Sequence, residues 1–342
     1  MRAFHSSAAT HHDPSTFLRY GKPIPHPESI ARYEMLIGAT ASVADLVETP
    51  DHGMAPILDV HAGDYVDLLQ SGFAQAVASQ GLIEEVMPTQ FAPWSPHRRP
   101  VGIAGRLGYH MTDTSTILRE GTWRAVYGAA QAAIAGADAL ASDGRAYALC
   151  RPPGHHASSA HAGGFCYLNN AAIAAQRLAS RHPRVAIFDI DVHHGNGTQE
   201  IFYGRSDVLF VSVHAETSSY FPYFSGYEDE IGQGEGKGAN LNLPLALGSG
   251  DREYCDAVTR GLQEIAAFDP SALVISLGLD AAADDPIGAL KISEDGFVEV
   301  ARSIAHLGKP TVLVQEGGYP CEALARNLTA FLRGFEEAAR LK

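Results

Sequence analysis

The sequence Asp191-Val192-His193 places a carboxylate and an imidazole two residues apart at the end of an apolar run. Side chains at positions i and i+2 of an extended strand point to the same side. With Asp280, which ends another apolar run, they would form a site of two oxygen ligands and one nitrogen ligand. Three protein ligands and an open position are typical of catalytic zinc, and Fe²⁺ also suits this ligand set. The alternative interpretation is a salt-bridged strand end.

The tandem His155-His156 follows the rigid turn Pro152-Pro153-Gly154, which could aim both imidazoles at the same edge. A neutral histidine can take a proton from water and pass it to a leaving amine if a carboxylate or amide orients its other nitrogen. Asp189 and Asn196 are available for that role. The sequence therefore predicts a general base beside the metal site.

The segment Glu316-Gly-Gly-Tyr319 lets the backbone turn tightly and brings a phenol to the site. A tyrosine hydroxyl can donate to the oxyanion of a tetrahedral intermediate, and one such donor contributes about 3 to 4 kcal/mol in other enzymes. Alone, Tyr319 would be a packing residue. Together with a metal and a base, it predicts hydrolysis of an amide.

Five short apolar runs must position these groups. Their Val and Ile content and the helix-length segments between them indicate buried parallel strands. Ligands bind beyond the carboxyl ends of such strands, so we expect all five polar clusters to converge on one edge of the sheet. The pattern predicts a single α/β domain over residues 1–342, a doubly wound, mostly parallel sheet flanked by helices. The expected strands are 146–149, 185–190, 208–213, 273–279 and 311–314, and the main expected helices are 123–141, 169–180, 251–268, 293–307 and 321–339.

Two segments show no periodic pattern. The first 30 residues predict an entry loop packed across the surface, and residues 84–108, with four prolines, predict a long loop. A long loop in a compact domain is usually a lid or an interface, with a passive insertion as the alternative. The glycine-rich run 232–238 lacks the GKS/T ending of a phosphate loop.

Composition narrows the class of partner. Of 342 residues, 39 are acidic and 25 basic, and the net charge of −14 disfavours nucleic acid and tolerates cationic ligands. The four cysteines have no CxxC spacing and no secretory leader precedes them, so we expect reduced thiols and a cytoplasmic location. No apolar run is long enough for a membrane span.

Four motifs together resemble the histone deacetylase superfamily, and within it most closely the bacterial acetylpolyamine amidohydrolases and histone-deacetylase-like amidohydrolases. The resemblance runs from about His26 to the C-terminus and implies the arginase/deacetylase-type fold. The motifs are Arg151-Pro-Pro-Gly-His-His-Ala157, Gly164-Phe-Cys-Tyr-Leu-Asn-Asn170, Asp189-Ile-Asp-Val-His-His-Gly-Asn-Gly-Thr198 and Glu316-Gly-Gly-Tyr319.

The resemblance implies a role for each matching residue. It implies zinc at Asp191, His193 and Asp280, and His156 as the general base. His155 would be an electrostatic partner, Asp189 and Asn196 would orient His155 and His156, and Tyr319 would polarise the scissile carbonyl. The implied substrate-tunnel residues are Phe165, Phe221, Gly164 and Gly317. Structural potassium is implied at Asp189, Asp191, His193, Ser212 and Val213, and at a second site at Phe202, Arg205 and Val208.

The segment 84–108 resembles the insertion through which acetylpolyamine amidohydrolases dimerise and narrow the tunnel, so a homodimer is implied. Where those enzymes have acids near the tunnel mouth, this chain has Phe17, Ala104 and Ser115; Asp113, Glu216 and Asp284 could substitute. We therefore expect a zinc-dependent deacetylase of small, polyamine-like N-acyl amines. The alternatives are a deacylase of protein acyl-lysine, an arginase-like dimetal hydrolase, and a catalytically silent binding protein.

Overall fold

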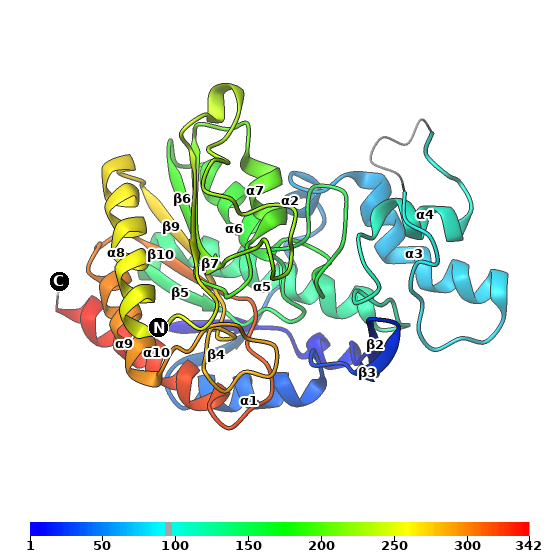
Figure 1. Cartoon of the computed structure of the whole chain (residues 1–342), viewed down its shortest axis with the longest axis horizontal. Helices are drawn as coiled ribbons and strands as arrows, with labels where there is room; N and C mark the ends of the chain where they lie inside the picture. The colour runs from blue at the N-terminus through cyan, green and yellow to red at the C-terminus, as the bar shows by residue number, and fades with distance from the viewer. Residues whose placement is uncertain (93–97, 342) are drawn as a thin grey trace.

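The computed structural model describes residues 1–92 and 98–341. Its centre is an eight-stranded sheet in the order β4-β1-β5-β10-β9-β6-β7-β8, with every neighbouring pair parallel (Figure 1). The strands are β1 (Arg2–His5), β4 (Asp45–Glu48), β5 (Arg145–Ala148), β6 (Val185–Asp189), β7 (Val208–Ala215), β8 (Asn240–Leu245), β9 (Ala272–Leu277) and β10 (Thr311–Gln315).

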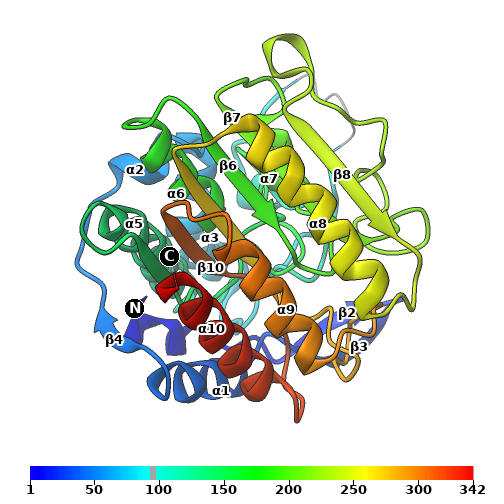
Figure 2. The ribbon, with the colours of Figure 1, turned by 90° about the vertical axis from the view of Figure 1, so that its left-hand side faces the viewer.

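Helices cover both faces of this sheet (Figure 2). One face packs against α1 (Ile30–Ala41), α8 (Asp251–Phe268), α9 (Glu294–Ala305) and α10 (Leu324–Arg340). The other packs against α5 (Thr122–Asp143), α6 (Asn170–Ala179) and α7 (Asn196–Phe202). Successive residues of a strand point to opposite faces of the sheet and so pack into the two apolar cores, one on each face. In β6, Phe188 packs on the face covered by α8 and Ile187 on the face covered by α5. The predicted doubly wound fold is confirmed.

A smaller apolar cluster lies beside the main sandwich. Helices α2 (Ala55–Leu58), α3 (Gly63–Gln80) and α4 (Ile103–His110) pack there against α5. A separate hairpin joins β2 (Thr16–Arg19) to β3 (Lys22–Pro25), and two short 3₁₀ helices lie at Ser7–His11 and Gly234–Gly236. The described part of the chain has no helix long and apolar enough to cross a bilayer.

Two expectations for the irregular segments were wrong in part. The first 30 residues are not only a surface loop, because β1 lies inside the sheet between β4 and β5, with Ala3 and Phe4 buried. Four residues are too few to display a period. Segment 84–108 becomes helical at Ile103, where α4 begins; residues 93–97, which include Pro93, Trp94 and Pro96, lie outside the described residues.

The five predicted strands correspond to β5, β6, β7, β9 and β10, which are contiguous in the sheet. Because the strands are parallel, their carboxyl ends share one edge, and the polar clusters follow those ends. The strand arrangement therefore brings His155, Asp280 and Tyr319 to one pocket, and Asp191 lies beside Asp280 at the same edge of the sheet.

Candidate active site

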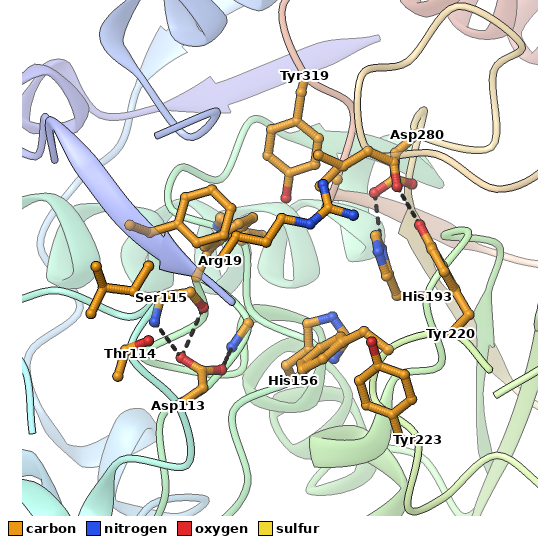
Figure 3. A pocket seen from close by; sticks show the side chains of 18 of the residues that line it. Arg19, Asp113, Thr114, Ser115, His156, His193, Tyr220, Tyr223, Asp280 and Tyr319 are labelled. Carbon is orange, nitrogen blue, oxygen red and sulfur yellow. Dashed lines mark hydrogen bonds and ion pairs between the residues drawn. The ribbon is translucent and has the colours of Figure 1, made fainter. Parts of the chain in front are cut away.

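A cavity of about 370 Å³ opens at this edge of the sheet (Figure 3). His156, His193 and Asp280 lie at its buried base, and aromatic side chains form its walls. The β2–β3 hairpin contributes Phe17 and Arg19 to its mouth.

Asp191, His193 and Asp280 form a compact cluster at the base. Nδ1 of His193 lies 3.1 Å from Oδ1 of Asp191 and 3.3 Å from Oδ2 of Asp280. One donor atom from each residue falls within 4.8 Å of the others, and all three side chains are buried. Burial opposes protonation of His193, but the two carboxylates outweigh it and raise its pKa to about 9.

The cluster fits a divalent cation. Oδ2 of Asp280 is buried and accepts no hydrogen bond from the described residues, and its 3.3 Å contact with Nδ1 of His193 joins two atoms that could both bind the ion. Gly317 leaves the space open, because a Cβ there would lie 2.0 Å from Oδ2 of Asp280 and 2.5 Å from Oδ2 of Asp191. Paired carboxylates and an imidazole match the donors of catalytic metal sites.

A second group of close donor atoms adjoins this cluster. It consists of His155, Cys166 and Glu316, within the described residues. Nδ1 of His155 is already engaged with Asp189, and burial raises the pKa of the Cys166 thiol well above its ordinary value. A neutral thiol and an engaged histidine make a poor second metal site, which disfavours the dimetal alternative.

The two tandem histidines have different partners. Nδ1 of His155 lies 2.9 Å from Oδ2 of Asp189, and Nδ1 of His156 lies 2.7 Å from Oδ1 of Asn196. Burial opposes protonation of His155, but the carboxylates of Asp189 and Asp191 outweigh it and raise its pKa well above the ordinary value. Burial and the positive charges of His155 and His193 lower the pKa of His156 well below the ordinary value. Protons therefore gather on His155 and leave His156 as a free base.

Glu316, which precedes the loop of Tyr319, is hydrogen-bonded to the turn that carries His155 and His156. Its Oε2 accepts hydrogen bonds from the backbone N–H groups of Gly154, at 2.6 Å, and His155, at 3.1 Å. Burial raises the pKa of Glu316 to about 7. The sequence analysis assigned no role to this carboxylate beyond its motif.

Tyr319 is held from two sides by residues that the sequence analysis did not identify. Its backbone N–H donates to Oδ2 of Asp285 at 2.8 Å, and the Arg32 guanidinium lies 5.2 Å from the centre of its ring. Nε of Arg32 also donates to the carbonyl oxygen of Gly318 at 2.6 Å. Burial raises the pKa of the Tyr319 hydroxyl well above its ordinary value, so the phenol keeps its proton. Asp285 comes five residues after Asp280, a spacing with no recognisable period.

A buried cluster of charged residues adjoins the loop that carries Tyr319, because Arg32 belongs to both. Glu28 lies between Arg32, at 2.8 Å, and Arg151, at 2.6 Å, and all three side chains are inaccessible to solvent. Arg151 belongs to one of the four sequence motifs, which indicates no role for it, and no motif contains Glu28 or Arg32. The available signal was their spacing of four residues, which is typical of an ion pair on a helix, although α1 begins only at Ile30.

Phe165 and Phe221 both line the pocket. The ring of Phe165 lies 5.7 Å from that of Tyr319, and the ring of Phe221 lies 4.9 Å from that of His156. Tyr220, which the sequence analysis did not single out, stacks on His193 with ring centres 4.9 Å apart. Gly164 lines the pocket with a φ of +53°, and a Cβ there would lie 2.4 Å from the His156 ring.

The residues expected near potassium lie in two places. In the first, Asp189 of β6 is opposite Ser212 of β7, and Ser212 Oγ lies 2.8 Å from Nδ1 of His214. In the second, between α7 and β7, the backbone N–H of Arg205 donates to the carbonyl oxygen of Phe202 at 2.9 Å. Ion binding at these positions stays a prediction, as it does for Asp191, His193, Val213 and Val208.

At the pocket mouth, Phe17 and Ser115 line the cavity and Ala104 does not. Of the three acids that could substitute, Asp113 lines the cavity, whereas Glu216 and Asp284 do not. Of these three acids, only Asp113 therefore lies at the rim of the cavity.

Known proteins resemble this chain along its whole length. Residues 26–335 match the histone deacetylase domain. The chain is 44% identical to acetylpolyamine amidohydrolase of Burkholderia pseudomallei, with 97% of each chain covered, and 42% identical to acetylpolyamine amidohydrolase 1 of Pseudomonas aeruginosa, with 94% of each covered. The crystal structure of acetylpolyamine aminohydrolase from Burkholderia pseudomallei matches with a TM-score of 0.95 at 41% identity, over 99% of both chains. The HDA15 HD domain matches with a TM-score of 0.81 at 27% identity, over 100% of this chain and 91% of that one. The chain therefore belongs to the histone deacetylase family.

Proposed function

We propose that this protein is a metal-dependent amidohydrolase that removes acetyl or other acyl groups from small N-acyl amines. The observation that carries the proposal is the meeting of a metal-type cluster, an unprotonated histidine and a buried phenol at the base of one aromatic pocket. Relatives named acetylpolyamine amidohydrolase, 42% and 44% identical over nearly the full length, support the substrate class.

Membership of the family implies a divalent metal. We assign Asp191, His193 and Asp280 as its ligands, with zinc as the ion and Fe²⁺ as the alternative. When bound, such an ion polarises a carbonyl group and lowers the pKa of water.

In this proposal, His156 is the general base. Nδ1 of His156 donates to the Asn196 amide oxygen, so the lone pair lies on Nε2, which takes a proton from the attacking water. The same nitrogen then passes the proton to the leaving amine. His155, held by Asp189, stays protonated and stabilises developing negative charge.

Tyr319 supplies the oxyanion donor. Its hydroxyl keeps its proton because burial raises its pKa, so it can donate a hydrogen bond to the carbonyl oxygen as that atom becomes negative. Asp285 and Arg32 orient the loop that carries it. Phe165 and Phe221 exclude water from the acyl chain, while Gly164 and Gly317 leave it room.

The outer features complete the proposal. We assign residues 84–108 to the tunnel rim and the interface of a homodimer, and the two expected potassium sites to a structural role. We also propose a cytoplasmic location, which the four free cysteines, two of them buried, support.

A kinetic comparison of three substrates tests the proposal. Metal-loaded protein should release free amine from N-acetylputrescine and N-acetylspermidine faster than from acetyl-lysine peptides. Preference for the peptides would replace the small-amine assignment with protein acyl-lysine. Binding without any turnover would replace the enzyme with a silent binding protein.

A further inference from the structure

The mouth of the pocket carries a cation without an acidic partner. Arg19 ends strand β2 and lines the cavity, and Figure 3 shows its side chain extending into the pocket. Its guanidinium forms no ion pair or side-chain hydrogen bond with any residue that the structure describes. The positive charge of Arg19 reaches Tyr220, which lines the pocket. Burial raises the pKa of the Tyr220 hydroxyl, and the charge of Arg19 partly offsets this increase.

The hairpin that carries Arg19 is fixed to the pocket wall. The ring of Phe17 lies 5.7 Å from that of Phe165 and 5.4 Å from that of His26. At the tip, Tyr20 and Gly21 have φ values of 51° and 75°, which close a tight two-residue turn. Arg19 is therefore presented to the cavity by an anchored element.

Asp113, the other charged group at the mouth, is already satisfied. Its Oδ2 accepts from the backbone N–H of Gly164 at 2.6 Å. Its Oδ1 accepts from the backbone N–H and hydroxyl of Ser115, both at 2.8 Å, and from the backbone N–H and hydroxyl of Thr116, at 3.1 and 3.3 Å. These five donors hold the pocket wall together, so this carboxylate has little capacity left for an ammonium group.

We propose that Arg19 is a specificity-determining residue that binds a carboxylate at the amine end of the substrate. This inference rests on the proposed function, in which the acyl group lies at the buried base and the amine chain runs to the mouth. A guanidinium without an acidic partner repels the distal ammonium of an acetylated diamine and pairs with a carboxylate. The substrate class is then an amino acid acylated on its side-chain amine.

Two matched substrates isolate the effect. Nε-acetyl-L-lysine and N-acetylcadaverine have the same carbon chain, acetyl group and amine, and differ only by the carboxylate. We expect kcat/KM to be about 10-fold higher for Nε-acetyl-L-lysine, which is the scale of one hydrogen-bonded charge pair. The pair Nδ-acetyl-L-ornithine and N-acetylputrescine should show the same direction with a shorter chain.

Variants of the hairpin attribute the preference to Arg19. Arg19→Gln should remove the preference by lowering kcat/KM for the amino acid, and Arg19→Glu should reverse it in favour of the diamine. Lys22→Gln is the matched control, because Lys22 is opposite Arg19 in the hairpin but does not line the cavity. Its ratio of the two kcat/KM values should equal that of the unmodified protein. Both Arg19 variants should keep the unmodified melting temperature, because Arg19 is exposed.

The outcomes separate this inference from the proposed function. Turnover of both substrates with the diamine preferred, or a preference that survives Arg19→Gln, would overturn the role of Arg19 and leave the amidohydrolase intact. Absence of turnover for every acetylated amine would overturn the proposed function itself.

Discussion

Nδ1 of His156 lies 2.7 Å from the amide oxygen of Asn196, at the carboxyl edge of the sheet. An amide oxygen only accepts hydrogen bonds, so this contact places the ring proton on Nδ1 and the lone pair on Nε2. The neighbouring His155 faces the carboxylate of Asp189 instead, at 2.9 Å, and a carboxylate favours the doubly protonated ring. The pair thus divides into one base and one cation through its hydrogen-bond partners.

Replacing that amide by a carboxylate should make His156 more basic. In Asn196→Asp, the added negative charge should raise the pKa of His156. Because the reaction needs the neutral ring, the acidic limb of the pH profile of kcat/KM should move to higher pH by about one unit. The measurement is the pH dependence of kcat/KM. An acidic limb at the same pH in both proteins would contradict the role of His156 as base.

Tyr319→Phe should remove the oxyanion donor and little else. We expect kcat to fall about 10²- to 10³-fold, with metal content and substrate binding retained, because the hydroxyl acts only when charge develops. Steady-state kinetics and elemental analysis measure both. Tyr227→Phe, which removes a hydroxyl outside the cavity, is the control. Unchanged turnover in Tyr319→Phe would exclude the donor role.

Asp285→Ala should act through Tyr319. Loss of the 2.8 Å contact leaves the buried N–H of Tyr319 unpaired and frees its loop, so we expect kcat to fall about 10-fold with metal content unchanged. If Asp285 acts by positioning Tyr319, adding Asp285→Ala to Tyr319→Phe should lower kcat no further. Asp284→Ala alters an exposed neighbouring carboxylate and serves as control. Additive losses in the double variant would show an independent role.

Asp280→Ala should lower the metal content of the purified protein. It removes one of three ligands, so the loss of affinity should exceed the roughly 10- to 100-fold effect of removing an outer hydrogen-bond partner. Elemental analysis after dialysis measures the occupancy. Full occupancy in Asp280→Ala would exclude this carboxylate as a ligand.

Metal binding should compete with a proton on His193. Its pKa is raised to about 9, so near pH 7 the free ring is protonated and the ion must displace that proton. The apparent affinity for Zn²⁺ should therefore rise about 10-fold per pH unit as the pH approaches 9, and then level. Competition with a chelator of known affinity, from pH 6 to 9, measures this dependence. A flat profile would contradict His193 as a ligand.

The sequence sufficed where local pattern and chemistry agree. The apolar runs before Asp191 and Asp280 are long enough to mark buried strands, and the parallel arrangement then sends both carboxylates to one edge. The resemblance to a known family implied Asp189 and Asn196 as the partners of His155 and His156, and both hydrogen bonds are present.

Sequence reasoning failed where position depends on distant contacts. β1 is four residues long and gains its place only by pairing with β4 and β5. Asp285 and Arg32 reach Tyr319 from loops and helices whose registers no local period reveals. The free charge of Arg19 could not be foreseen either, because it depends on which acids lie within reach in three dimensions.

Metal-dependent hydrolysis of an N-acyl amine at this pocket can be tested directly. The measurement is acetate release from N-acetylcadaverine and Nε-acetyl-L-lysine before metal removal, after chelation, and after Zn²⁺ is restored. We expect one acetate per free amine formed, loss of turnover on chelation, and recovery with Zn²⁺ in the unmodified protein but not in Tyr319→Phe. Turnover that persists at full rate without metal would exclude metal-dependent hydrolysis, and full recovery in Tyr319→Phe would exclude Tyr319 as the oxyanion donor.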